Sequence, residues 1–151
     1  MQTNHLKALA AALVLISYAG FAAASGTATV QVKATVSKVC KFSTTTMTAI
    51  DLGTIDPSTV AADVTGTTNV TYNCSKGTTP GVTVTSGGTS LTDGTNSIAY
   101  AFTLGTPEAG TGFSSSGSAK VIGTATILKA AAQDAAASTT YADTVTLTID
   151  N

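Results

Sequence analysis

The chain has 151 residues, of which 43% are hydrophobic and 10% are charged, and its net charge is −1. This length indicates one domain, and the charge leaves no basic patch for nucleic acid or anionic lipid. Because the apolar fraction is near normal and the net charge is small, the composition is not typical of a disordered chain.

The first 24 residues predict a secretory signal peptide. His5 and Lys7 precede an apolar run over residues 8–21, and an A-x-A cleavage site follows at residues 22–24. The run is short for a transmembrane span, which needs roughly 20 apolar residues, and a retained membrane anchor is the alternative. Cleavage would remove the only His and leave six lysines against eight acids, with no Arg or Trp. We expect an exported mature chain over residues 25–151 that is rich in Thr and all-β.

Residues 27–36 alternate strictly between polar and apolar side chains over five periods. This pattern predicts an extended strand with one apolar face, because successive strand side chains point to opposite sides. We interpret residues 25–37 as an N-terminal arm that precedes a domain over residues 38–151. The apolar positions of the arm are Ala28, Val30, Val32, Ala34 and Val36.

Two cysteines, Cys40 and Cys74, remain in the mature chain. After export to an oxidising compartment such a pair normally closes to a disulfide, and two free buried thiols are the alternative. A bridge would enclose about 35 residues and stabilise the fold by roughly 3–4 kcal/mol in the chain-entropy estimate. Two cysteines without a His cannot form a structural zinc site.

The rest of the chain predicts short strands separated by turns. Asp93-Gly94 is a hairpin signal, and residues 129–138 are expected to be a loop with room for one helical turn. Turn signals about every 8–12 residues indicate a sandwich of six or seven strands. We expect no strand after the last one, which would leave the sandwich incomplete. The expected strands cover residues 50–56, 69–74, 82–85, 97–104, 119–128 and 140–151.

Three segments carry a likeness to a known family. They are the alternating arm with its following cysteine at residues 28–40, Val-Thr-Tyr-Asn-Cys-Ser-Lys-Gly-Thr at residues 70–78, and Tyr-Ala-Asp-Thr-Val-Thr-Leu-Thr-Ile at residues 141–149. In this order they resemble the spore coat protein U domain, the subunit fold of archaic chaperone–usher pili of Gram-negative bacteria.

The resemblance implies an all-β fold: an incomplete, six-stranded immunoglobulin-like sandwich that lacks its last strand and carries an N-terminal donor strand. It implies a pilin that polymerises head-to-tail into a surface fibre for adhesion and biofilm formation. Its partners would be further copies of itself, a periplasmic chaperone and an outer-membrane usher. The five apolar residues of the arm would be donor side chains, Val145, Leu147 and Ile149 would line the acceptor groove, and Cys40 and Cys74 would form the family's disulfide.

Other interpretations remain open. The pattern of the arm alone favours an ordinary first strand of its own sandwich, whereas the missing last strand and the resemblance favour strand exchange. A secreted, stand-alone binding or coat module that does not polymerise is the alternative function. We expect no enzyme, cofactor or metal, because the mature chain has no His or Arg and its acids are scattered, although a paired-carboxylate hydrolase stays conceivable.

Overall fold

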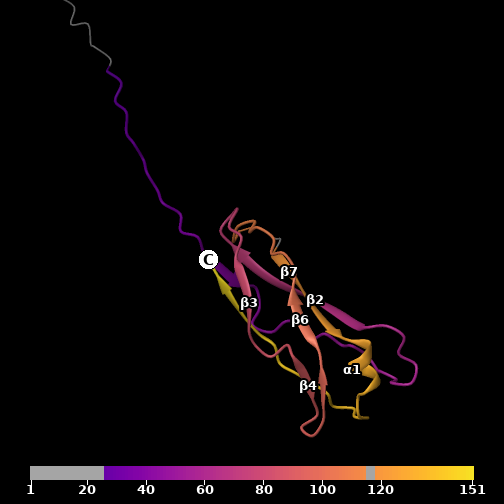
Figure 1. The fold of residues 1–151 in the computed structure, drawn as a ribbon. Coiled ribbons are helices and arrows are strands. Elements are labelled where there is room, and N and C mark those ends of the chain that lie inside the picture. Colours follow the sequence, from indigo (N-terminus) through magenta and orange to yellow (C-terminus); the bar gives the residue numbers. More distant parts are fainter. Residues whose placement is uncertain (1–25, 115–117) are drawn as a thin grey trace, which may run out of the picture. The chain divides into compact units, whose positions relative to one another are not determined.

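The computed structural model describes residues 26–114 and 118–151. The chain divides into two units, Met1–Thr35 and Val36–Asn151, and every strand of the described residues lies in the second. The fold of this unit is all-β with one short helix, as expected (Figure 1). The predicted signal peptide, residues 1–24, lies outside the described residues.

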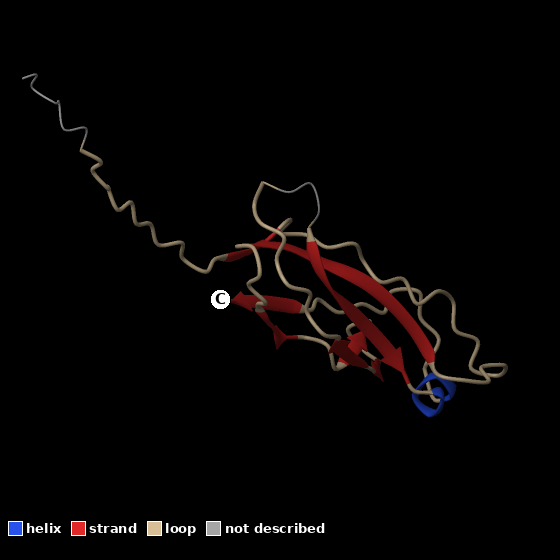
Figure 2. Cartoon of the chain, turned by 90° about the horizontal axis from the view of Figure 1, so that it is seen from above, coloured by secondary structure: helices blue, strands red, loops and turns tan. Residues whose placement is uncertain are grey.

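The largest sheet has four antiparallel strands in the order β1-β2-β7-β6. Their side chains alternate as the sequence pattern predicts, so that Val70, Tyr72 and Val121 face the core while their neighbours face water. The long β2 and β7 run beside each other through the middle of the sheet (Figure 2). The strand bounds are β1 Cys40–Phe42, β2 Val64–Cys74, β6 Ala101–Leu104 and β7 Ala119–Ile127.

The remaining elements form two small sheets and a helix. Strand β3 (Gly81–Ser86) pairs with β8 (Thr146–Asp150), and β4 (Ser90–Thr92) pairs with β5 (Ser97–Ala99). The hairpin predicted at Asp93-Gly94 is confirmed, because it connects β4 to β5. The helical turn in residues 129–138 is α1 (Lys129–Gln133).

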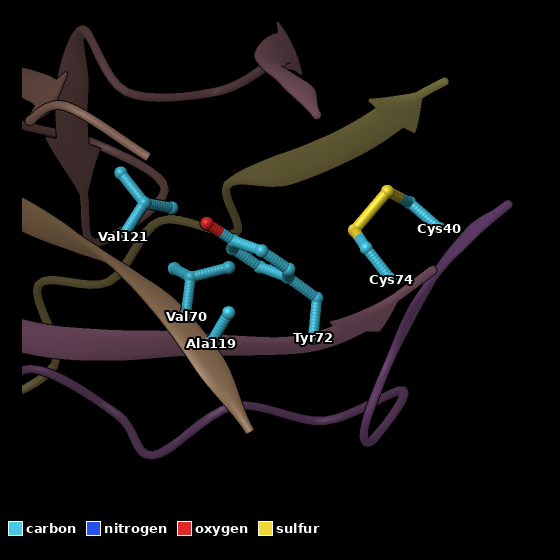
Figure 3. Packing of buried hydrophobic residues seen from close by; sticks show 6 residues of the cluster. All are labelled: Cys40, Val70, Tyr72, Cys74, Ala119 and Val121. Carbon is cyan, nitrogen blue, oxygen red and sulfur yellow. A yellow bond between two sulfur atoms is a disulfide. The ribbon is translucent and has the colours of Figure 1, made fainter. Parts of the chain in front are cut away.

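The core consists of two clusters. In the first, the disulfide between Cys40 and Cys74 lies beside Tyr72, and Val70 lies on the other side of the Tyr72 ring (Figure 3). Leu147 and Ile149 of β8 pack against this cluster. The buried Tyr72 hydroxyl donates to the backbone oxygens of Glu108 at 2.8 Å and Lys120 at 3.1 Å. The second cluster contains Ile98, Ile127 and Ala132. The predicted disulfide is therefore present, and it joins residues directly opposite each other on β1 and β2.

Three strand predictions need correction, and the described residues hold eight strand segments rather than the expected six or seven. Residues 50–56 form no strand, because Ile50 and Leu52 turn their side chains toward β2 over Gly66, where a Cβ atom would collide with them. The strand expected at 97–104 divides at Tyr100, since β5 pairs with β4 whereas β6 pairs with β7. The last strand begins at Thr146, and residues 140–145 approach it without ladder pairing apart from a bridge between Thr92 and Ala142.

Candidate functional site

The site begins with β8, which is paired along one edge by β3. In residues 26–114 and 118–151, β8 pairs with β3 and with no other strand. Val145, Leu147 and Ile149, the predicted groove residues, are all half-buried, and the latter two pack on the core cluster that contains Val70. The free edge of β8 therefore lies next to side chains that the core covers incompletely.

A cavity of about 640 Å³ lies along this free edge. Its lining is mostly apolar and includes Val70 of β2, Ala125 of β7 and Phe102 of β6. One side is formed by residues 143–147, which contain the beginning of β8, and another by the segment from Phe42 to Leu52. The cavity thus exposes part of the sandwich interior beside an unpaired strand edge.

A second cavity, of about 900 Å³, continues from the first. Both cavities are lined by Ile50, Leu52 and Leu91, so they share a boundary. The second lies between residues 50–57 and residues 135–141, and buried Ile98 and Ile127 contribute to its lining. We call the two cavities together the β8 groove.

The segment opposite β8 is held by isolated hydrogen bonds and not by a ladder. Ser43 N donates to Thr71 O at 3.0 Å, and Thr68 Oγ1 donates to Thr48 O at 2.9 Å. No strand is assigned between Phe42 and Val64. This side of the β8 groove has fewer backbone constraints than β8 and can adjust to an occupant more readily.

Asp143 fixes the approach to β8 through a small polar cluster. Its carboxylate accepts hydrogen bonds from Gly88 N at 2.7 Å, Tyr100 Oη at 2.8 Å and Thr144 N at 2.7 Å. The bond from Gly88 N, followed by that from Tyr100, lowers the pKa of Asp143, while burial and the Asp143 carboxylate raise the pKa of Tyr100 to about 12. Asp143 therefore stays ionised well below neutral pH, and Tyr100 stays protonated well above it.

One end of the β8 groove is closed. The backbone N of Cys40 donates to Oδ1 of Asn151, the residue after β8, and β1 contacts β8. Beside this point Ser75 N donates to Val39 O at 2.9 Å, and Ser75 Oγ donates to Ser37 O at 3.0 Å. Residues 37–40 are therefore fastened to the domain by Ser75 and the disulfide.

The predicted donor side chains are outside any strand of the structure. Ala28, Val30, Val32, Ala34 and Val36 are all exposed, and Val30 and Val32 are 85% and 89% exposed. They are available to a partner, and their role as donors stays a prediction.

The sequence did not identify Phe102, Val70 and Ala125 as groove residues, nor the polar cluster around Asp143. Alternation places the first three inward but does not say which inward residues a missing strand leaves uncovered. Besides its local bond from Thr144 N, Asp143 accepts hydrogen bonds from Tyr100 and Gly88, which are distant in sequence.

In three comparisons, no family model, no curated protein and no solved structure matched the chain. Within the described residues there is no group of three or more His, Cys, Asp or Glu side chains that could hold a metal ion. Over the same residues, no helix has the length and apolar character needed to cross a membrane. The arrangement that remains is an apolar groove beside an open strand edge, which can accept a further strand.

Proposed function

We propose that this chain is a structural pilin subunit that polymerises head-to-tail into a surface fibre. The arm of one copy adds to β8 of the next copy, and a periplasmic chaperone and an outer-membrane usher assemble the fibre, as the family resemblance implies. The fibre serves adhesion and biofilm formation, and the exposed side chains of Ala28, Val30, Val32, Ala34 and Val36 are the donors.

One observation carries this proposal: the edge of β8 that has no partner among the described residues faces a cavity lined by buried Val70 and Ala125. An open strand edge is a template for pairing with another chain. When a strip of core lies beside that edge, an added strand gains both main-chain hydrogen bonds and apolar burial.

The strand order supports an incomplete immunoglobulin-like sandwich. A seven-strand domain of this kind places strands A, B, E and D in one sheet and C, F and G in the other. The order β1-β2-β7-β6 corresponds to the first sheet, and the pair β3-β8 corresponds to C and F. The position of strand G is then the free edge of β8.

The energy available to such an addition is adequate for stable assembly. Burial of three Val and two Ala side chains gives on the order of 6–9 kcal/mol. Main-chain hydrogen bonds to β8 add to this value, at about 1 kcal/mol each. A head-to-tail contact that does not close on itself generates a fibre, and the slow unfolding of completed sandwiches keeps it intact.

Two matched double substitutions test the proposal. Val30→Asp with Val32→Asp places two charges on the apolar face of the arm, and Thr29→Asp with Gln31→Asp places the same charges on the polar face. Both pairs lie among exposed residues, so neither disturbs the chain's own core. We expect the first pair to abolish multimers that resist detergent at room temperature, and the second pair to preserve them.

Deletion of residues 27–36 should likewise abolish these multimers while the protein is still exported and still binds its chaperone. Heat-stable multimers of the deleted chain would show that the arm is not the donor. A chain that is secreted and remains monomeric without any substitution would instead support a stand-alone binding or coat module.

A further inference from the structure

The β8 side of the β8 groove has one charged position. Alternate residues along this side line a cavity or pack on the core: Tyr141, Asp143, Val145, Leu147 and Ile149. Thr144 and Thr146, which lie between them, also contribute to the lining of the first cavity. Four of these five positions are apolar or aromatic, and the second is the hydrogen-bonded carboxylate of Asp143.

The arm has the same number of inward positions at the same spacing. Its five apolar residues span eight residue steps, as do the five positions from Tyr141 to Ile149. Fully extended at about 3.3 Å per residue, the arm spans about 26 Å. Because the two sets have the same number of positions at the same sequence spacing, a donor arm from a second copy can place one side chain at each position.

The direction of the arm follows from the closed end of the groove. The arm continues from Val36 into residues 37–40, which Ser75 and the disulfide fasten to a folded domain. The C-terminal end of an inserted arm must therefore lie where the groove is open. The Ile149 end is closed by the contact between Cys40 and Asn151. Val36 of the donor copy then lies near Tyr141, and the arm runs antiparallel to β8.

The geometry points to a single register, in which Ala34 of the donor copy lies opposite the Asp143–Tyr100 pair and Asp143 selects a small side chain at that position. This inference rests on the proposed function. In this register Val32 and Val30 lie opposite Val145 and Leu147, which line the first cavity, and Ala28 lies at the closed end beside Ile149.

The alternatives fit less well. In the parallel arrangement, Val30 would cover the Asp143 carboxylate and Ala34 would lie opposite Leu147. Antiparallel shifts by two residues would bring Val36 or Val32 against Asp143. A bulky apolar side chain there would remove water from a charged carboxylate, whereas a methyl group leaves space around it. Asp143 cannot turn away without losing its bonds to Gly88 N and Tyr100 Oη.

The first test uses the full chain. Ala34→Leu should weaken subunit association by about 5- to 150-fold and so reduce detergent-resistant multimers, because overpacking at one site typically costs about 1–3 kcal/mol. Gln31→Leu, an equally exposed arm position on the polar face, is the control and should assemble as the unmodified chain does. Equal assembly of the two variants would overturn the selection of a small residue opposite Asp143.

The second test reads the register directly. The full chain with Val30→Asp and Val32→Asp, whose own arm cannot compete, receives a synthetic peptide of residues 26–37 with methyl-labelled Ala34 and Val30. We expect nuclear Overhauser contacts between the Ala34 methyl group and the Tyr100 ring.

Contacts of Val30 with Tyr100 instead would overturn the register and leave strand addition intact. Failure of the peptide to bind, together with monomeric behaviour of the unmodified chain, would overturn the register and the proposed function together. If the chain with Val30→Asp and Val32→Asp does not fold, the comparison of Ala34→Leu with Gln31→Leu still tests whether a small residue is selected opposite Asp143, because both substitutions lie in an exposed arm.

Discussion

Truncation of two donor side chains gives a quantitative test of the arm. Val30→Ala with Val32→Ala removes four methyl groups from side chains that are 85% and 89% exposed, so the chain's own core is unaffected. In the β8 groove of a neighbouring copy those carbons would be shielded from water. At about 0.8 kcal/mol per carbon the double variant should lose about 3 kcal/mol of subunit contact, which is roughly a 150-fold weaker association.

The assay is dissociation of preformed multimers in guanidinium chloride, followed by light scattering. Thr29→Ala with Gln31→Ala is the matched control, because it truncates the two intervening residues of the polar face. The valine variant should dissociate at a clearly lower denaturant concentration than this control. Dissociation of both double variants at the same concentration would refute the assignment of the valines as donors.

Three further predictions concern the domain. Tyr72→Phe should lower the free energy of unfolding by about 1–3 kcal/mol in denaturant titrations, because it leaves the carbonyls of Glu108 and Lys120 without this donor. Reduction of the Cys40–Cys74 disulfide should lower it by roughly 3–4 kcal/mol, measured with and without reductant. The pKa of Asp143 is lowered in the fold, so the ionised carboxylate stabilises the folded state. This contribution to the free energy of unfolding is complete above the unfolded pKa of about 4 and is lost as the pH falls through the lower folded pKa. Asp143→Asn should therefore reduce the acid-induced fall in stability in thermal melts between about pH 5 and pH 2.

Each of these predictions has a contradicting outcome. Unchanged stability of Tyr72→Phe would mean that water or another group replaces the lost donor at no cost. Equal stability of the oxidised and reduced proteins would mean that the bridge does not restrict the unfolded chain. An acid transition of Asp143→Asn that coincides with that of the unmodified protein would show that the bonds from Gly88 N and Tyr100 Oη do not favour the ionised form.

The parts of the fold that the sequence predicted are those with local signals. The alternation in residues 69–74 and 119–128 corresponds to β2 and β7, since a strand with one buried face requires a period of two. The hairpin at Asp93-Gly94 follows from turn chemistry that depends on two residues alone. The disulfide follows from the number of cysteines and the expected compartment.

The parts that the sequence could not predict depend on contacts between distant segments. Residues 50–56 have the composition of a strand, but their apolar side chains pack over Gly66, whose missing side chain leaves room for them. The break at Tyr100 arises where the chain changes partner from β4 to β7. Likewise, no local pattern brings Asp143 together with Tyr100 and Gly88. The free edge of β8 could be expected, but not the side chains exposed beside it.

Amide hydrogen exchange of the arm tests strand addition most directly. Residues 27–36 belong to no strand of the described chain, so their amides should exchange rapidly in monomers. In multimers, alternate amides of this segment should be strongly protected by hydrogen bonds to β8 of the next copy. Exchange of the arm in multimers as fast as in monomers would contradict strand addition.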